Sequence, residues 1–360
     1  MSKAHLMAEI KMTCPHCGQL LRCDEGHRGG KIKCPHCKHL ILVPKIPAAG
    51  TKPARRWSTR RKLMAVALIL LAVAVVARVW IVPPQIIHWP DRRPIGVLIL
   101  ASNFHSSPTN PRGWFNDPAL DFTGTNGMEN FRRALLDYTD RSIAILKRTG
   151  AQGVIVWDLE GEEFSHKTSF IGDPRLLNRL APEMAAVADE FFQRLRNAGF
   201  KVGLTVRPQQ LVFDDNGQPR QTQVFDTKRT LLEKIDYART RWGATIFYVD
   251  SNYGILRPDE VWQLRRLVEQ HPDILLIPEH HYLPYSAFSA PYISLRKNIP
   301  AEPSGLARKL FPVSFRALDI GDASSDQVSL AWQQGDVLLF RAWFWNTDCQ
   351  LLENFTHERQ

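Results

Sequence analysis

The chain has 360 residues and a formal net charge of +10, and its length suits about two domains of roughly 100–200 residues each. The positive charge is confined to one end: residues 1–62 hold 14 Lys/Arg and 3 Asp/Glu, whereas the rest of the chain holds 32 and 33. This distribution excludes a basic nucleic-acid surface over most of the chain. Beyond residue 62 the sequence has one cysteine, Cys349, which excludes an internal disulfide framework there.

Two C-x-x-C motifs near the N-terminus predict a structural zinc site. The motifs are separated by 16 residues. Structural Zn²⁺ takes four tetrahedral ligands, and two such turns supply four thiolates. The expected ligands are Cys14, Cys17, Cys34 and Cys37. A disulfide or redox role is the alternative, disfavoured by the paired motifs and by the cytoplasmic location expected below. Cys23 is interpreted as a bystander.

Residues 1–44 resemble the small zinc ribbons found at the N-termini of bacterial membrane proteins. The run "CPHCGQLLRCDEGHRGGKIKCPHCKHLILVP" contains both motifs and ends at Pro44. The resemblance implies a fold rather than a function, because such ribbons bind nucleic acid, bind protein or stabilise a tail. We do not expect nucleic acid to be the main partner, and the protein partners of the ribbon stay open.

A basic linker, residues 45–62, leads into an apolar segment, residues 63–82, which predicts a single transmembrane helix. The first 15 residues of this segment carry no charge, and a helix of 20 residues spans about 30 Å. Lys and Arg gather before the segment, so the positive-inside rule places the N-terminus in the cytoplasm. The expected location is the cell membrane, single-pass, with an extracytoplasmic C-terminal domain.

A Pro-rich stalk, residues 83–94, is expected before a large domain, residues 95–360, in which apolar runs alternate with amphipathic ones. This alternation is typical of a parallel sheet covered by helices. Seven strands are predicted, at residues 95–100, 153–158, 200–206, 244–250, 273–279, 311–320 and 336–345. Helices are predicted at residues 129–149, 181–199, 226–243, 257–270 and 324–334.

The fold class predicted for this domain is α/β, a (β/α)8 TIM-type barrel, with an open doubly wound sheet as the alternative. The chain has no G-x-G-x-x-G motif and no P-loop, and its length favours the barrel. An eighth strand is not evident. It lies after Trp345, or the barrel is incomplete.

Acidic and polar residues follow most of the predicted strands, where a barrel places its chemistry. Residues two apart on a strand point the same way, so Tyr248 aligns with Asp250, whereas Trp157 and Asp158 diverge. Aromatic rings near these acids suit the faces of sugars. The expected substrate-binding residues are Asp158, Glu160, Arg207, Tyr248, Asn252, His280, Asp319 and Trp157.

The domain resembles glycoside-hydrolase barrels of the α-amylase and α-galactosidase kind. The runs "GFKVGLTVRPQ" and "FYVDSN" are similar to strands three and four of those enzymes, and "LLIPEH" to strand five of the α-amylase group. The resemblance implies Asp250 as nucleophile and Glu279 as general acid/base, the carboxylate pair that cleaves glycosidic bonds. The α-amylase group has an Arg where this chain has Tyr248, and the α-galactosidase group would take its acid from Asp319 or Asp322.

These observations predict a membrane-anchored, extracytoplasmic glycosidase-like enzyme that acts on a poly- or oligosaccharide. One alternative is a non-catalytic barrel that binds glycan or protein. Another is a transmembrane signalling protein with the zinc ribbon as its cytoplasmic output. Acids after strands also cap loops and helix N-termini, so Asp158, Asp250 and Glu279 have a purely structural interpretation as well. A metal at His280 and His281 is disfavoured, because adjacent histidines point apart.

Overall fold

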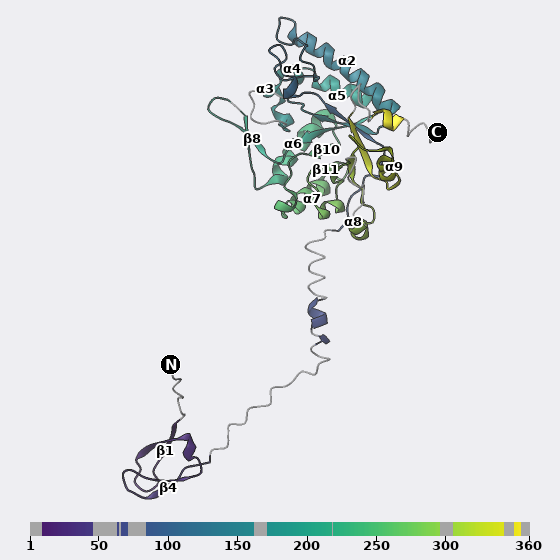
Figure 1. Ribbon diagram of the computed structural model, residues 1–360. Helices are drawn as coiled ribbons and strands as arrows, with labels where there is room; N and C mark the ends of the chain where they lie inside the picture. Colours follow the sequence, from purple (N-terminus) through teal and green to yellow (C-terminus); the bar gives the residue numbers. More distant parts are fainter. Residues whose placement is uncertain are drawn as a thin grey trace. The chain divides into compact units, whose positions relative to one another are not determined.

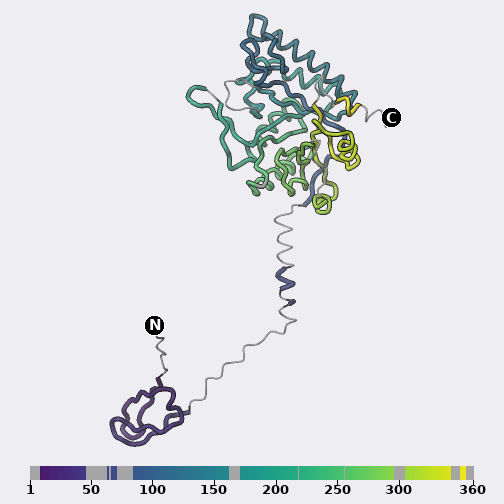
Figure 2. Tube along the Cα trace, in the orientation of Figure 1, coloured from purple at the N-terminus to yellow at the C-terminus, as the bar shows by residue number. Residues whose placement is uncertain are grey.

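The computed structural model divides the chain into two compact units, Met1–Val73 and Ala74–Gln360 (Figure 2). The described residues are 9–45, 63–64, 66–70, 84–161, 171–217, 219–295, 305–341 and 349–353. Across these residues, no helix has both the length and the apolar character needed to cross a membrane. Within the predicted span, residues 63–64 and 66–70 are helical and the others lie outside the described residues. The transmembrane helix therefore stays a prediction.

The N-terminal unit is built from two β-hairpins around the two C-x-x-C motifs. Its elements are β1 (Glu9–Thr13), β2 (Leu20–Asp24), the 3-10 helix η1 (Glu25–His27), β3 (Lys31–Lys33) and β4 (Leu40–Leu42). β1 pairs with β2 and β3 with β4, both antiparallel. The buried core holds little besides Leu21, Ile41 and two of the cysteines. Units below about 40 residues usually need a metal or disulfides, because so small a core buries too little apolar surface.

The described residues of the C-terminal unit form a barrel of eight parallel strands surrounded by helices (Figure 1). The strands are β5 (Ile95–Ile99), β6 (Gly153–Trp157), β7 (Lys201–Val206), β10 (Ile246–Val249), β11 (Leu275–Pro278), β12 (Tyr292–Ser294), β13 (Ala317–Asp319) and β14 (Val337–Arg341). They pair in the order β11-β10-β7-β6-β5-β14-β13-β12. The first strand, β5, thus lies beside the last, β14 (Figure 2). This order confirms the predicted (β/α)8 architecture and excludes the open sheet.

The strand that the sequence analysis misses is β12. It lies in a Pro-rich stretch between the fifth and sixth predicted strands, not in the tail after Trp345. Three residues are too few to show a periodic pattern. Just before β12, the N–H of Ala290 donates to the carbonyl of Leu276 on β11 at 3.0 Å, so the two ends of the sheet meet and the barrel is nearly closed. As a consequence, Asp319 ends the seventh strand rather than the sixth.

Helices cover the outside of the barrel. They are α2 (Gly127–Arg148), α3 (Leu177–Leu180), α4 (Pro182–Ala185), α5 (Ala188–Asn197), α6 (Thr227–Trp242), α7 (Glu260–Gln270), α8 (Gly305–Leu310) and α9 (Ser325–Gln333). Short 3-10 helices are η2 (Asn103–His105), η3 (Pro174–Leu176), η4 (Gly254–Leu256) and η5 (Leu283–Ala287). The helix predicted over residues 181–199 is broken into α4 and α5. A hairpin of β8 (Gln210–Phe213) and β9 (Pro219–Thr222) projects from the loop after β7 (Figure 1).

The ends of α6 follow the predicted signals. The side chain of Asp226 caps the helix by accepting the N–H of Arg229, and Gly243 ends it with a φ of 67°. Asparagine and glycine alone adopt that left-handed conformation at low cost, which explains the glycine at this C-terminus.

Side chains alternate in direction along the strands, and this alternation produces two hydrophobic cores, one between the barrel and the helices and one inside the barrel. The outward-facing residues of β7, Val202 and Leu204, pack with the helices, whereas Ile246 and Tyr248 of β10 pack inside the barrel. Gly203 faces inward where β10 comes close, and a Cβ there would lie 2.2 Å from the carbonyl oxygen of Ile246. Only glycine permits the two strands to pair at this distance.

Residues 84–94, predicted as a stalk, instead pack across the amino ends of the barrel strands. Trp89 is 7% exposed and joins the interior core, and its indole N–H donates to Gln152 Oε1 at 3.0 Å. Asp91 pairs with Lys201 Nζ at 2.7 Å. This segment is therefore part of the barrel domain.

Candidate functional site

Inward-facing residues at the carboxyl ends of the strands form a polar layer at the mouth of the barrel. Because strand residues alternate in direction, each of these side chains lies above the apolar interior core. Members of this layer are Trp157, Arg207, Asp250, Glu279, Asp319 and Arg341. Acids and arginines thus meet at the end of the barrel where catalysis occurs in this architecture.

Arg207 and Asp250 form a buried ion pair between neighbouring strand ends. Arg207 Nε donates to Asp250 Oδ2, and the two side chains are 11% and 7% exposed. Arg207 Nη1 also donates to Gln221 Oε1 at 2.8 Å, and its backbone N–H donates to the carbonyl of Gly172 at 3.1 Å. The guanidinium is therefore held in place and neutralises the Asp250 carboxylate. It comes from the end of β7, whereas the α-amylase resemblance would place an arginine at Tyr248.

Glu279 lies beside Asp250, because it directly follows Pro278 of β11, the partner of Val249 on β10. Burial raises the pKa of Glu279, and the neighbouring Asp250 carboxyl raises it further, whereas the Ser251 N–H and His280 lower it. The Ser251 N–H donates to Glu279 Oε2 at 2.7 Å. Burial and a neighbouring carboxylate thus favour the protonated form of Glu279.

Non-glycine residues adopt left-handed conformations within three residues of the ends of three strands. Asp158 after β6 and Ser251 after β10 each have a φ of 57°, and Asp322 after β13 has a φ of 64°. This conformation costs about 1–3 kcal/mol for such residues and gathers at functional sites. The strain coincides with the mouth of the barrel.

Two tyrosines lie beneath the acidic groups. The ring of Tyr248 lies 4.9 Å from that of Trp157 and 5.4 Å from that of Tyr292, and the Tyr292 hydroxyl donates to Asp319 Oδ2 at 3.1 Å. Burial raises the pKa of both tyrosines, and the carboxylates above them raise it further. Both hydroxyls therefore stay protonated, and that of Tyr292 already donates to Asp319.

A cavity of about 210 Å³ opens at this layer. Its wall is mostly apolar or aromatic, with two charged groups, Asp319 and Arg341. The other lining residues are Val97, Ile99, Ile155, Trp157, Tyr248, Tyr292 and Leu339. Asp250 lies two residues beyond Tyr248 of the wall and on the same side of β10. Apolar walls with a few fixed polar groups are typical of small-molecule sites.

Several of the predicted binding residues are tied into the loops. Asn252 is 2% exposed; its Oδ1 accepts the His280 N–H at 2.8 Å, and its Nδ2 lies 3.4 Å from the Tyr285 hydroxyl. It thereby joins the loop after β10 to the loop after β11. The His280 side chain is exposed, with Nδ1 3.8 Å from Glu279 Oε2. Asp158 is 5% exposed at the end of β6.

Glu160 belongs to a buried charge cluster behind Arg207. Glu160 Oε1 accepts the Asp173 N–H at 2.7 Å, and Asp173 pairs with Arg175 at 2.8 Å and with Lys234 at 3.6 Å. Lys234 Nζ donates to the carbonyl of Arg207 at 2.7 Å. Burial raises the pKa of Glu160 to about 7 and lowers that of Lys234 to about 8. The cluster supports the backbone that carries Arg207.

The sequence analysis does not single out two residues of the cavity, Tyr292 and Arg341. Arg341 lies two residues beyond the inward-facing Leu339, so the alternation rule could have revealed it. Tyr292 could not be predicted as a site residue, because its strand is too short to be recognised from the sequence.

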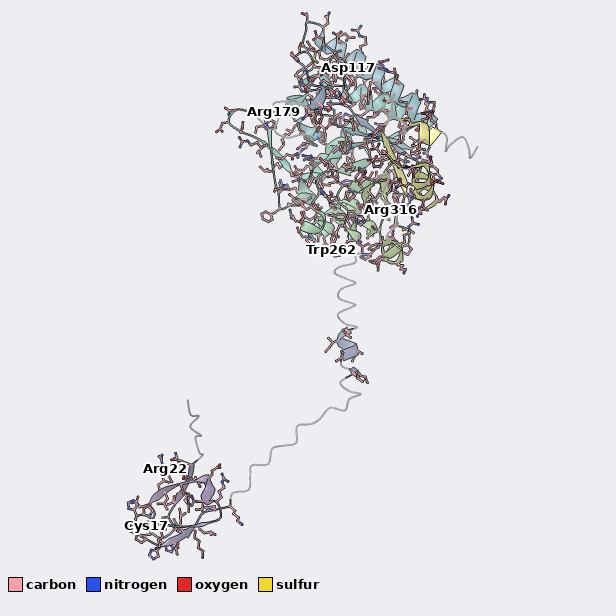
Figure 3. All side chains as sticks on the ribbon, in the orientation of Figure 1. Cys17, Arg22, Asp117, Arg179, Trp262 and Arg316 are labelled. Atoms are coloured by element: carbon pink, nitrogen blue, oxygen red, sulfur yellow. The ribbon has the colours of Figure 1, made fainter. Side chains whose placement is uncertain are left out.

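The four predicted zinc ligands converge in the N-terminal unit, where Figure 3 labels Cys17. Their Sγ atoms all lie within 4.8 Å of one another, and the pairs Cys14–Cys37 and Cys17–Cys34 are each 3.7 Å apart. Four Zn–S bonds of about 2.3 Å form a tetrahedron with edges of about 3.8 Å. The arrangement thus fits a metal such as zinc, and Cys23 is not one of the clustered residues.

Comparisons with known proteins give structural similarity only. No family model matches the chain, and no curated protein matches it. Among solved structures, an α-fucosidase of Thermotoga maritima has a TM-score of 0.39 at 11% identity, covering 76% of this chain and 73% of its own. α-L-Fucosidase isoenzyme 1 of Paenibacillus thiaminolyticus has a TM-score of 0.42 at 12% identity, covering 74% and 73%. A maltogenic α-amylase of Thermotoga neapolitana has a TM-score of 0.36 at 14% identity, covering 66% and 60%. Because these TM-scores and identities are low, the residues of this chain alone carry the proposals that follow.

Proposed function

We propose that the barrel hydrolyses glycosidic bonds with Asp250 and Glu279. One observation carries the proposal: the two carboxyl groups follow neighbouring paired strands but differ in environment, since Arg207 pairs with Asp250 while burial and the Asp250 carboxyl raise the pKa of Glu279. Glycosidases need such a pair, one carboxyl protonated and the other ionised. The ring of Trp157 in the neighbouring wall offers an apolar face for a sugar.

In this proposal, Glu279 gives its proton to the glycosidic oxygen as the bond to the anomeric carbon breaks. The Asp250 carboxylate bonds to that carbon. Glu279, now ionised, takes a proton from water, whose oxygen attacks the anomeric carbon and releases Asp250. The two carboxyls follow paired strands, which lie about 4.7–4.9 Å apart, and this spacing favours the retaining course, because inversion needs about 6.5–9.5 Å between the carboxyls to admit water.

A panel of aryl glycosides and oligosaccharides, assayed by aglycone release and reducing ends, tests the proposal. Glu279→Gln is expected to lower kcat by about 10²–10⁴-fold, the usual contribution of a general acid, and Asp250→Asn to lower it at least as much. Asp326→Asn, which changes an exposed acid in the first turn of α9, is the matched control. Proton NMR of the first product is expected to show retained anomeric configuration.

Two outcomes would contradict the proposal. If the wild type turns over no member of the panel yet binds one, the barrel is a non-catalytic glycan-binding domain. If Asp319→Asn abolishes activity while Glu279→Gln does not, the general acid lies on β13 instead.

We further propose that residues 63–82 anchor the chain in the cell membrane with the barrel outside. The apolar run and the Lys/Arg residues before it support this arrangement. In intact cells, protease is expected to digest the barrel and spare an N-terminal tag. Digestion of the tag with protection of the barrel would contradict the orientation.

A further inference from the structure

A second cavity lies in the same unit, and its lining includes neither of the proposed catalytic carboxyls. Its volume is about 350 Å³, against 210 Å³ for the barrel cavity. It lies between the β8–β9 hairpin and the start of α6, and its polar lining residues are Arg175, Gln210, Asp226, Arg229, Thr230 and Glu233. The hairpin is held by Arg179, labelled in Figure 3, whose guanidinium lies 3.1 Å above the ring centre of Phe213.

The charges that line this cavity compensate one another. Arg175 Nη1 donates to Glu233 Oε2 at 2.6 Å, and Arg229 Nε donates to Glu233 Oε1 at 3.1 Å. Asp226 Oδ1 accepts the N–H of Arg229 at 2.9 Å. Two arginines and two acids leave no net charge in the lining. An ionic ligand would need an excess of opposite charge, so the lining fits a neutral ligand rich in hydroxyl groups.

A largely exposed aromatic residue stands between two lining residues of the cavity in the sequence. Phe225 follows Val224 and precedes Asp226, both of which line the cavity, and it is 94% exposed. Its backbone is held by Arg257, which donates to the carbonyls of Val224 at 2.8 Å and Phe225 at 3.0 Å. A ring on a fixed backbone needs little ordering when it binds. An apolar face beside hydroxyl-binding groups suits a sugar unit, which has C–H faces and a hydroxyl edge.

The cavity is joined to the catalytic residues by two short routes. Gln210 of the lining lies on β8, and the partner strand β9 carries Gln221, which accepts from Arg207 at 2.8 Å. Glu233 of the lining is followed by Lys234, which donates to the Arg207 carbonyl at 2.7 Å. Arg207 in turn holds Asp250. The lining residues come from the loops after β6 and β7 and from the start of α6, which places the cavity on the same side of the barrel as Asp250 and Glu279.

We propose that the second cavity binds sugar units next to the bond that is cleaved, so that the substrate is a neutral glycan chain rather than a single glycoside. The choice of ligand rests on the proposed glycosidase function. Phe225 stacks on one sugar unit, and the arginines and Glu233 hydrogen-bond its hydroxyl groups. Affinity then depends on chain length, and residues outside the catalytic machinery carry that dependence.

Titration calorimetry on Asp250→Asn, used as the non-hydrolysing form, tests the proposal with malto-, cello-, xylo- and chito-oligosaccharides of one to six units. Affinity for the matching series is expected to rise with chain length. Adding Phe225→Ala is expected to weaken binding of the longer members by about 3–10-fold, the range for an aromatic stacking contact, and to leave the monosaccharide unchanged. Arg229→Ala, at a side chain 77% exposed, is the second variant. Phe104→Ala, at a ring 92% exposed after β5, is the matched control and is expected to change nothing.

The possible outcomes distinguish failure of the second cavity as a sugar site from failure of the proposed glycosidase function. A wild type that binds the chain through Phe225 but hydrolyses nothing supports the cavity and refutes the enzyme. A wild type that hydrolyses aryl monosaccharides, with no dependence on chain length and no effect of Phe225→Ala or Arg229→Ala, overturns the cavity and leaves the enzyme standing. Equal losses in Phe225→Ala and Phe104→Ala also overturn the proposed site.

Discussion

Glu160→Gln is expected to stabilise the protein at neutral pH and to leave its stability nearly unchanged in acid. Glu160 is 3% exposed, and burial, with the negative charge of Asp173 adding to it, raises its pKa from 4.5 to about 7. Between these pH values the folded chain holds a proton that the unfolded chain has released. The free energy of unfolding therefore falls as the pH rises through that window.

The size of the effect follows from the same groups. At about 1.4 kcal/mol for each pKa unit, ionising Glu160 costs the folded state about 3 kcal/mol above pH 7. Glutamine keeps the acceptor for the Asp173 N–H, which lies 2.7 Å away, and carries no charge. Lys234 loses an opposite charge in the variant, which offsets part of the gain. We expect a net stabilisation of about 1–3 kcal/mol at pH 8 and little at pH 4.

Urea unfolding of the full-length chain at several pH values between 4 and 8, followed by tryptophan fluorescence, measures this difference. The m value is expected to be unchanged, because the variant exposes the same surface on unfolding. Glu129→Gln, at an exposed position in the first turn of α2, is the matched control. If the advantage of Glu160→Gln is the same at pH 5 and pH 8, Glu160 ionises in the folded protein as it does in the unfolded chain, and the reasoning is refuted.

Two further predictions concern the metal cluster and the barrel interior. Cys17→Ser is expected to lower the zinc content of the purified chain below one ion per molecule, as measured by mass spectrometry. Cys23→Ser is expected to keep the full zinc content. Equal zinc content in the two variants would contradict the four-cysteine site. Gly203→Ala is expected to lower the free energy of unfolding by about 1–3 kcal/mol, because its Cβ meets the Ile246 carbonyl. Gly305→Ala, where a Cβ meets nothing within 4 Å, is the control for thermal unfolding.

The features that the sequence predicts correctly depend on local chemistry. The cysteine spacing identified the four clustered thiols, since each C-x-x-C turn places its own pair. Apolar runs of six to ten residues identified seven of the eight barrel strands. Asp226 and Gly243 marked the ends of α6, because capping needs only neighbouring backbone groups. The alignment of Tyr248 with Asp250 followed from the two-residue repeat of a strand.

Contacts between distant parts of the chain could not be predicted from these local patterns. β12 has three residues, and its place in the barrel depends on pairing with β13 rather than on its own pattern. The prolines before β5 suggested a stalk, but Trp89 packs into the barrel because Gln152 and Lys201, far along the chain, receive it.

The sequence by itself determined the elements, the metal ligands and the acids at the strand ends, because periodicity, caps and short motifs depend on neighbours along the chain. Only the tertiary structure decided what those acids do. In the folded chain, Arg207 and Glu279 lie on either side of Asp250, and Glu160 lies in a buried cluster with Lys234. Burial and charge at each carboxyl depend on side chains from other strands, so pattern along one strand cannot assign a proton to either member of the pair.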